Sequence, residues 1–286
     1  MEELQKVTFS QRLRTVQSKK GSLLCVGLDA DLQKLPSGFK RTPSGALSFL
    51  RSIIESTYDL VCAYKPNLAF FESMGPEGLA VLKDTLTFIP QNIITIGDAK
   101  RGDIGNTAEH YASSLFDDLG FDAVTVNPYM GKDSVLPFLG RPGKGAFLLA
   151  LTSNPGSADF QRRKVGPRPL YEVVVRTSKG WDERGSLGYV VGATHPAQLR
   201  RLRALAPQAP FLIPGVGSQG GDLESSVRFG CTKHHDLAVI NVGRSVLYAS
   251  RGKDFALAAR NEAQKVWNGI ESARTESPRI GRAPRR

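Results

Sequence analysis

The densest group of charged residues in the chain is Gly97–Asp103, which reads GDAKRGD. It follows a short apolar run, so it is expected where a buried strand ends. Side chains alternate along a strand, so Asp98 and Lys100 are predicted to point to the same side. A nucleophilic lysine needs a lowered pKa, whereas neighbouring carboxylates favour the ammonium form. We therefore expect Lys100 to be a proton donor and a stabiliser of developing negative charge.

A second lysine, Lys65, ends another apolar run and is expected beside this segment. Buried charges are costly unless they are paired, and an alternating array of Lys65, Asp98, Lys100 and Asp103 would pair them. The alternative is a salt-bridge network that only closes the fold. Three charges at adjacent strand ends, with a fourth close by, favour a functional site.

Two glycine-containing loops near the end of the chain predict a phosphate site. Gly215–Gly220 matches GxGxxG, but the dinucleotide fingerprint belongs to a first βα unit and needs an acidic residue closing the next strand. Here the nearest candidate, Asp236, precedes its strand. Backbone N–H groups of such a loop cradle phosphate, and Arg244, after Gly243, can bind it in a bidentate manner. The alternative, two ordinary glycine turns, is disfavoured by their joint placement.

The histidines and cysteines do not have the spacing of a metal site, so no metal is predicted. The four histidines are expected to be structural residues or to lie at the surface: His110, His195, His234 and His235. His195, just before Pro196, is expected near a helix N-cap. The three cysteines are widely spaced and include no CxxC pair: Cys25, Cys62 and Cys231. Cys25 and Cys62 lie in apolar runs, where core packing is expected.

The elements that must position these residues alternate between short apolar runs and amphipathic segments. The expected strands are Ser22–Leu28, Val61–Lys65, Asn92–Gly97, Ala123–Asn127, Ala146–Leu151, Gly188–Gly192, Pro210–Pro214 and Leu237–Asn241. The expected helices include Gly78–Ile89, Ile104–Leu119 and, most clearly, Pro196–Ala206.

Eight strands, each followed by a helix or a loop, are the number in a (β/α)₈ TIM barrel. Continuous apolar strands fit a parallel sheet covered by helices. A doubly wound open sheet is the rival architecture, but eight units over about 250 residues favour the barrel. In a barrel the chemistry is expected at the C-terminal ends of the strands, where the charged residues and both glycine loops lie.

The predicted organisation is one α/β domain, residues 1–273, with an Arg-rich tail, residues 274–286, expected to be disordered. A short helix over Ser10–Lys20 precedes the first strand and could plug the bottom of the barrel. A basic insertion, Phe160–Pro169, follows the fifth strand and is expected to be a mobile flap rather than core.

Composition limits the class of protein. The chain has 286 residues, of which 41% are hydrophobic and 23% charged, which excludes a disordered, collagen-like or coiled-coil protein. It contains no apolar window of membrane-spanning length, and its beginning lacks the apolar core of a signal peptide. We therefore expect a cytoplasmic protein that does not bind a membrane.

The net charge of +11 is compatible with an anionic ligand. Five Arg and one Glu in the tail contribute +4 of it, and the remaining +7 suits a phosphate-bearing substrate. A basic tail can bind nucleic acid, but a solvated terminus is the favoured interpretation, and no nucleic-acid partner is predicted.

Several segments together resemble the orotidine 5′-phosphate decarboxylase family, most closely its longer bacterial branch. They cover about residues 10–265 and read LCVGLDAD at 24–31, YKPNLAFFE at 64–72, GDAKRGDIGNTA at 97–108, NPYMGKDS at 127–134, LTSNPGSADFQ at 151–161, PGVGSQGGD at 214–222 and NVGRS at 241–245. The resemblance implies the same barrel, a homodimer, no metal or organic cofactor, and decarboxylation of orotidine 5′-phosphate to UMP and CO₂.

The resemblance also implies a role for each matching residue. Lys100 would protonate C6 of the pyrimidine, and Asp98 would lie beside the substrate carboxylate. Lys65 and Asp29 would hold ribose hydroxyls, while Ser153 would bind the pyrimidine edge.

Asp103, which ends the charged block, and Thr107 would reach into the partner subunit's site, and Ile104 would line its carboxylate pocket. Gln219 would bridge the phosphate and the base. The phosphate itself would bind to Gly243 and Arg244. The resemblance assigns no role to the Arg162–Lys164 insertion or to the Arg-rich tail.

Two other functions are compatible with parts of the sequence. Related barrel enzymes act on sugar phosphates with a similar Asp-x-Lys-x-x-Asp block, but they typically need Mg²⁺, so insensitivity to EDTA would separate the two. A basic barrel that binds RNA through its tail and surface is the other alternative. The chain lacks the interleaved aromatic and basic motifs of RNA-binding modules.

Overall fold

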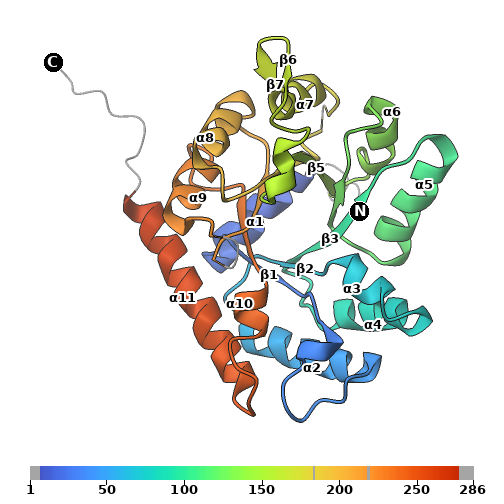
Figure 1. Cartoon of the computed structure of the whole chain (residues 1–286), viewed down its shortest axis with the longest axis vertical. Coiled ribbons are helices and arrows are strands. Elements are labelled where there is room, and N and C mark those ends of the chain that lie inside the picture. The colour runs from blue at the N-terminus through green and yellow to red at the C-terminus, as the bar shows by residue number, and fades with distance from the viewer. Residues whose placement is uncertain (1–6, 183, 218–219, 277–286) are drawn as a thin grey trace.

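Eight parallel strands close into a barrel surrounded by helices (Figure 1). The computed structural model describes residues 7–182, 184–217 and 220–276. The strands are β1 (Leu24–Gly27), β2 (Ala63–Lys65), β3 (Ile94–Arg101), β4 (Ala123–Val126), β5 (Gly145–Leu151), β8 (Leu187–Val191), β9 (Phe211–Pro214) and β10 (Ala238–Val242). Their order around the barrel is β1-β10-β9-β8-β5-β4-β3-β2. The predicted (β/α)₈ barrel is confirmed, and a doubly wound open sheet is excluded.

Helices surround the barrel, and α8 carries its predicted start signal. They are α1 (Phe9–Lys20), α2 (Pro43–Thr57), α3 (Leu68–Glu72), α4 (Pro76–Thr87), α5 (Gly105–Ser113), α6 (Lys132–Val135), α7 (Leu170–Ser178), α8 (Pro196–Leu205), α9 (Leu223–Gly230), α10 (Arg244–Leu247) and α11 (Phe255–Glu276). Helix α8 has Pro196 in its first turn and His195 at its N-cap, as predicted. The helix expected over Ile104–Leu119 is α5 followed by a π-helical turn, Ser114–Asp118.

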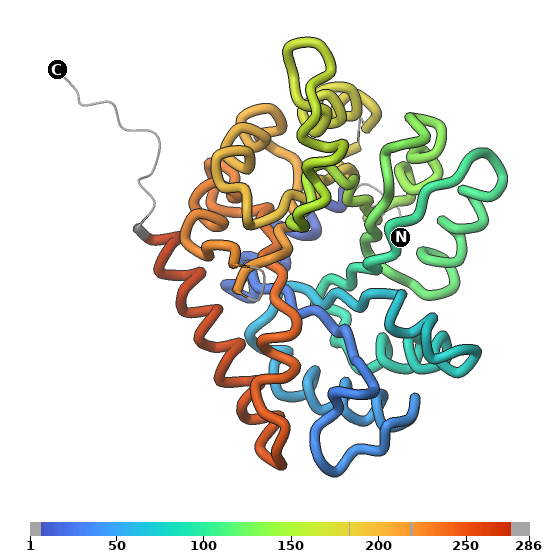
Figure 2. Tube along the Cα trace, in the orientation of Figure 1, coloured from blue at the N-terminus to red at the C-terminus, as the bar shows by residue number. Residues whose placement is uncertain are grey.

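Helix α1 closes the N-terminal end of the barrel, as the sequence predicts (Figure 2). Phe9 and Leu13 are buried in one cluster with barrel residues that include Cys25 and Cys62. The ring of Phe9 meets Phe147 edge-on, with 5.8 Å between ring centroids. Such aromatic contacts add to the stabilisation from apolar burial, so the plug fixes the floor beneath the functional end.

Strand β3 departs from regular geometry at the residues that matter most. Its register with β4 shifts between Gly97 and Arg101, and Lys100 has a φ of 47°, in the left-handed region. The strict alternation expected through Lys100 is therefore wrong. The side chains of Asp98 and Lys100 nevertheless meet, because the irregular backbone turns Lys100 back towards the carboxylate.

The basic insertion after β5 forms an exposed antiparallel hairpin, β6 (Lys164–Val165) and β7 (Arg168–Pro169). Phe160 at its base is 72% exposed, which confirms that the insertion lies outside the core. Its mobility stays a prediction. The expected tail begins inside α11, which runs to Glu276, and residues 277–286 lie outside the described part of the chain.

Candidate active site

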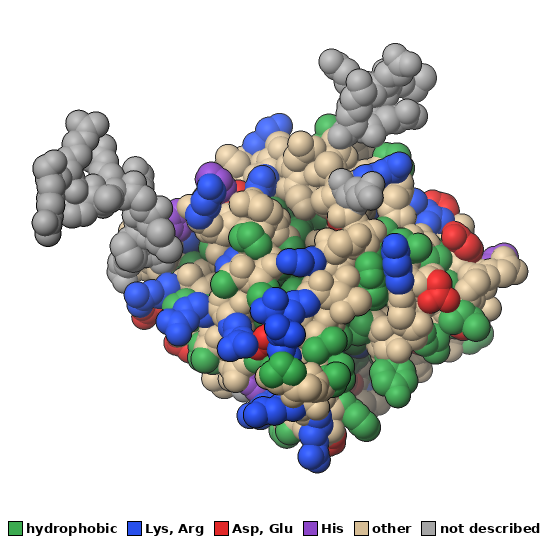
Figure 3. Space-filling view, turned by 90° about the horizontal axis from the view of Figure 1, so that it is seen from above, with side chains coloured by type: hydrophobic (Ala, Val, Ile, Leu, Met, Phe, Trp, Pro, Cys, Tyr) green, Lys and Arg blue, Asp and Glu red, His purple; other side chains and the backbone are tan. Residues whose placement is uncertain are grey.

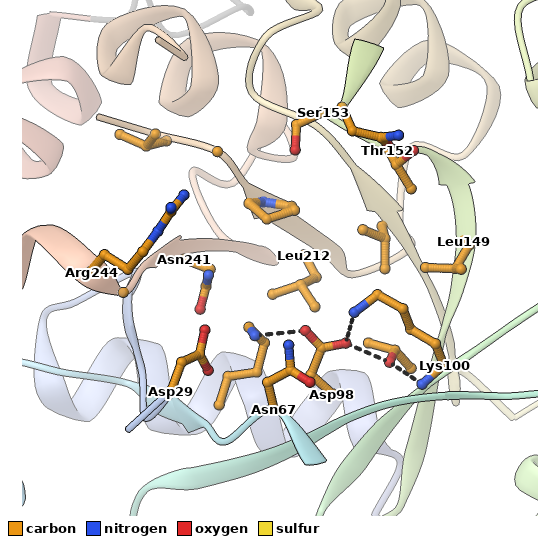
Figure 4. Close-up of a pocket in the computed structure, with 18 residues that line it drawn as sticks. Asp29, Asn67, Asp98, Lys100, Leu149, Thr152, Ser153, Leu212, Asn241 and Arg244 are labelled. Carbon is orange, nitrogen blue, oxygen red and sulfur yellow. Dashed lines mark hydrogen bonds and ion pairs between the residues drawn. The ribbon is translucent and has the colours of Figure 1, made fainter. Parts of the chain in front are cut away.

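A polar cavity of about 280 Å³ opens at the C-terminal ends of the barrel strands (Figure 4). Its lining includes seven predicted site residues: Asp29, Lys65, Asp98, Lys100, Ser153, Gly243 and Arg244. Figure 4 shows Lys100 and Arg244 on opposite sides of the cavity. Residues separated widely in sequence thus converge on one site, as is usual at this end of a TIM barrel.

The centre of the site is a carboxylate held between two ammonium groups. Lys65 Nζ lies 2.8 Å from Asp98 Oδ2, and Lys100 Nζ lies 2.6 Å from Asp98 Oδ1. Thr125 Oγ1 donates a further hydrogen bond of 2.9 Å to Asp98 Oδ1 and accepts one from the backbone N–H of Lys100. These bonds fix the Lys100 side chain at the edge of the cavity before any ligand arrives.

Burial and charge oppose each other in this group. Burial disfavours the charged form of Lys65, but Asp98 and Asp29 outweigh it and raise the pKa of Lys65 above its ordinary value. Burial also disfavours the Asp98 anion, yet Lys65 and Lys100 lower the pKa of Asp98 well below its ordinary value. Near neutral pH the site therefore contains a lysine–carboxylate–lysine chain in which Lys65 and Asp98 are ionised.

Asp29 lies next to this chain, and its pKa is shifted in the opposite direction from that of Asp98. Burial, only partly offset by Lys65, raises the pKa of Asp29 above its ordinary value. Its Oδ1 atom is buried and has no hydrogen-bond partner among the described residues. A buried polar atom without a partner is costly, so a ligand hydroxyl at this point would satisfy it.

The loop after β5 carries Ser153, and neighbouring side chains hold this loop in place. Gln161 Oε1 accepts a hydrogen bond of 2.7 Å from Thr152 N, and its Nε2 donates one of 2.9 Å to Thr152 Oγ1. Thr194 Oγ1 donates to the carbonyl of Ser153 at 3.3 Å. A Cβ at Gly192 would lie 2.7 Å from Ser153 N, so only glycine allows this close approach. The Ser153 side chain is thereby positioned at the cavity (Figure 4).

The predicted phosphate region is formed by the ends of β9 and β10. Gly215, Gly243 and Arg244 all line the cavity. The β9 loop folds back on itself, with Gly221 N donating to Gly215 O at 3.0 Å. Gln219 lies outside the described residues, so its predicted contact with phosphate is not described.

Three predicted residues, Asp103, Ile104 and Thr107, do not line this cavity. Asp103 Oδ1 accepts a hydrogen bond of 2.8 Å from Ile104 N, and within the described part of the chain it makes no ion pair with Lys100. The four-membered array expected within one chain therefore has three members. The reason is local: Asp103 lies beyond the strand, where the backbone turns away into α5.

The structure adds polar residues that sequence reasoning missed, among them Asn67, Thr125 and Asn241. Asn67 caps α3 through its side chain and pairs with Asp98 in an isolated β-bridge. Thr125 could have been noticed as a polar residue within an apolar strand. Asn67 follows Lys65 by two residues at a strand end, which is the same signal that identified Asp98.

The structure supports one prediction on stability. Asp98→Asn leaves the buried Lys65 without its carboxylate partner, and breaking a buried pair in this way costs about 3–5 kcal/mol. Urea denaturation at pH 7 should show a loss of that order. Asp118→Asn is the matched control, because the exposed Lys83–Asp118 pair is worth at most about 1 kcal/mol. Equal losses in the two variants would contradict the interpretation.

The same pair predicts a pH dependence. Because the pKa of Asp98 is lowered by folding, its ion pairs stabilise the protein above the ordinary carboxyl pKa, and this stabilisation is lost as the pH falls below about 4. The difference in unfolding free energy between wild type and Asp98→Asn should therefore shrink as the pH is lowered from 5 towards about 2.5. A constant difference over this range would exclude Asp98 as the titrating group.

Within residues 7–182, 184–217 and 220–276 there is no group of three or more His, Cys, Asp or Glu side chains that could hold a metal ion. No helix among these residues is both long and apolar enough to cross a membrane.

Known proteins are similar to this chain in both sequence and architecture. Residues 22–259 match the model of the orotidine 5′-phosphate decarboxylase / HUMPS family. An orotidine 5′-phosphate decarboxylase of Thermomicrobium roseum is 45% identical over 94% of this chain and 97% of its own length. One of Cupriavidus metallidurans is 48% identical over 94% of this chain and 99% of its own length.

Solved structures agree. The OMP decarboxylase of Leishmania donovani is 40% identical, with a TM-score of 0.80 over 93% of this chain and 100% of that chain. The UMP synthase of the same organism is 41% identical, with a TM-score of 0.82 over 93% of this chain and 57% of that chain. The chain therefore belongs to the orotidine 5′-phosphate decarboxylase / HUMPS family.

Proposed function

We propose that this protein decarboxylates orotidine 5′-phosphate to UMP and CO₂ without a cofactor. The observation that carries the proposal is Asp98 bound by Lys65 and Lys100 at 2.8 and 2.6 Å, in a cavity lined on its other side by Arg244. Family membership and the similarity to named decarboxylases over nearly the whole chain support it.

Loss of CO₂ leaves an electron pair on C6 of the pyrimidine, which the ring delocalises poorly. The ammonium group of Lys100 is already oriented at the cavity and offsets this charge as it develops. It then donates its proton to C6. Asp98 would lie beside the leaving carboxylate, and it positions Lys100. Lys65 holds Asp98 in place. Lys65 and Asp29 together would hold ribose hydroxyls.

The remaining residues would bind the two ends of the substrate. Arg244 and Gly243, with Gln219, would hold the phosphate, and Ser153 would bind the edge of the pyrimidine. Binding energy at the phosphate, remote from the broken bond, then positions the ring for reaction. Asp98 is also placed to repel the substrate carboxylate, although preorganised stabilisation by Lys100 is the larger contribution in this account.

The proposal includes a homodimer with shared active sites. Asp103 and Thr107 would act in the partner's site, with Ile104 lining its carboxylate pocket. Exposed apolar side chains support a subunit contact on this side: Ile104 is 58%, Met130 51% and Tyr129 88% exposed. The proposed unit is the catalytic domain 1–273 with the tail 274–286, working in the cytoplasm without nucleic acid or membrane.

Purified protein is incubated with orotidine 5′-phosphate, with and without EDTA, and the fall in substrate absorbance is followed. The expected result is turnover that EDTA does not change, with UMP as the product. Turnover that EDTA abolishes would favour the Mg²⁺-dependent enzymes on sugar phosphates. No turnover in either condition would contradict the proposal.

Arg244→Ala tests the phosphate site. Loss of a charge-assisted contact costs about 1.5–3 kcal/mol, so the Kd for UMP should rise by roughly 10- to 150-fold. The Kd for uridine, which has no phosphate, should stay unchanged. Calorimetric titration of both ligands measures this, with the exposed Arg251→Ala as the matched control. Equal effects on UMP and uridine would place the phosphate elsewhere.

A further inference from the structure

A second cavity, of about 450 Å³, lies between α8 and α9. Its lining also includes Pro207 and Gln208, which precede β9, and four residues that precede β10: Cys231, Thr232, Lys233 and His235. Because these loops lead into the strands, the cavity lies towards the N-terminal end of the barrel, opposite the candidate active site. Helices α8 and α9 are neighbours on the outside of the barrel (Figure 1).

The lining of this cavity is strongly basic. It includes Arg200, Arg203, Arg228 and Lys233, and no Asp or Glu is found among the described residues that line it. Arg200, Arg228 and Lys233 are exposed, and none forms an ion pair with a described residue. By contrast, Arg201, the next residue on α8, pairs with Glu172. Lys and Arg side chains also gather near the centre of the face of the molecule that Figure 3 shows.

Arg203 gives the cavity a fixed positive charge. Its Nε donates to the backbone carbonyl of Gly230 at 3.0 Å, and its Nη1 donates to the carbonyls of Ala206 at 3.1 Å and Ala209 at 2.7 Å. The guanidinium carbon lies 3.7 Å from the centroid of the Phe211 ring. Burial lowers the pKa of Arg203 to about 10, which still leaves it charged at neutral pH. No carboxylate of the described chain forms an ion pair with Arg203, although the charge of Asp236 offsets part of the effect of burial on its pKa. A bound anion would add counter-charge beside this guanidinium.

The same cavity has an aromatic and apolar wall. The guanidinium carbons of Arg200 and Arg228 each lie 5.7 Å from the centroid of the Phe229 ring, so the two cations share one ring. Val227 and Cys231 are buried beside it and add apolar surface. Guanidinium planes and aromatic rings both stack on flat ligands, and guanidinium groups bind phosphate oxygens.

The loop that borders the cavity has an unusual backbone. Among the described residues, only three that are not glycine have a φ in the left-handed region, namely Lys100, His235 and Leu237. One is the central lysine of the candidate active site, and the other two lie in or next to the loop Cys231–His235. Such conformations are costly and are concentrated at functional sites. This strain supports the cavity as a built site, alongside its charge and shape.

We propose that this cavity is a second ligand site, which binds a phosphorylated molecule that contains a flat ring, such as a purine nucleotide. The phosphate would bind to Arg200, Arg228 and Lys233, and the ring would pack on Phe229. The site is separate from the decarboxylation cavity and does not depend on the function proposed above.

Calorimetric titration with ADP tests the site, using one variant for each cavity. Wild type should bind ADP saturably. Replacing Arg200 and Arg228 together by Gln should raise the Kd for ADP at least about tenfold, because two charge-assisted contacts are lost. Arg244→Ala, in the catalytic cavity, should leave this Kd unchanged. Arg176→Gln, an exposed arginine on α7, is the matched control for the change in charge and should also leave it unchanged.

Four outcomes would overturn the proposal. The first is that wild type shows no saturable binding of ADP, and the second is that the Kd for ADP stays unchanged in the Arg200→Gln, Arg228→Gln variant. The third is that Arg244→Ala alone abolishes ADP binding. The fourth is that wild type binds ADP, adenosine and inorganic phosphate with equal affinity. The double variant should keep wild-type decarboxylation, which also shows that it folds. If wild type binds ADP as expected but does not decarboxylate orotidine 5′-phosphate, the proposed function fails and the second site stands.

Discussion

Lys100→Ala should lower the kcat for decarboxylation of orotidine 5′-phosphate by at least about 10⁴-fold. A positioned general acid is worth about 10²–10⁴-fold, and a group that also stabilises charge in the transition state adds about 10²–10³-fold. The alanine variant loses both contributions. Because the Lys100 side chain is 49% exposed and Asp98 keeps its bond to Lys65, the barrel should remain folded.

The loss must be separated from unfolding and from weaker binding. Circular dichroism and the Kd for UMP should stay close to wild type in Lys100→Ala. Lys83→Ala, which removes a lysine from an exposed ion pair with Asp118, is the control for loss of a surface charge and should keep wild-type kcat. A kcat for Lys100→Ala within tenfold of wild type would refute the mechanism.

Mixing two inactive variants should restore activity if the active sites are shared. In a mixed dimer of Lys100→Ala and Asp103→Ala subunits, one site lacks both residues and the other has both. Random pairing makes half of the dimers mixed, so activity should return to about one quarter of the wild-type value. The structure motivates the test, since the Asp103 carboxylate accepts a hydrogen bond from Ile104 N and, within the described residues, makes no ion pair with Lys100 of its own chain.

Subunit exchange must be confirmed independently, for example by native mass spectrometry of differently tagged chains. A mixture of Lys100→Ala with Lys100→Ala,Asp103→Ala subunits is the matched control and should stay inactive. If exchange is complete and the first mixture stays inactive, Asp103 acts within its own subunit or only in folding, and the shared-site proposal is wrong.

The barrel was predictable because its signals are local. Each expected strand is a short apolar run, and each overlaps a strand of the structure; for example, Ala123–Asn127 contains β4. The start of α8 was also predictable, because Pro196 favours a first helical turn. The plug formed by α1 followed from its position before the first strand, although its contact with Phe147 is a long-range packing detail that the sequence does not specify.

The candidate site was predictable where it follows strand ends and less so elsewhere. Asp29, Lys65, Asp98 and Arg244 follow directly from that rule, and the structure brings them to one cavity. Thr125 was missed because its position inside an apolar strand resembles core, and only the pairing of β3 with β4 places it against Asp98.

Backbone geometry was the least predictable feature. The irregularity of β3 at Lys100 depends on how β3 pairs with β4, and no local sequence signal marks a positive φ at a lysine. The four-membered charge array failed for a related reason. It placed the Asp103 carboxylate close to Lys100, whereas the chain turns towards α5 after the strand and this carboxylate accepts a bond from Ile104 N.

The central claim is that Lys100 exchanges a proton with a carbanion at C6. By microscopic reversibility, the protein should then exchange the C6 hydrogen of UMP with solvent, even without decarboxylation. UMP is incubated with wild type in D₂O, and the C6 proton signal is followed by NMR. The account predicts that this signal disappears with wild type and persists with Lys100→Ala. Persistence with active wild type, or equal exchange in both proteins, would contradict it.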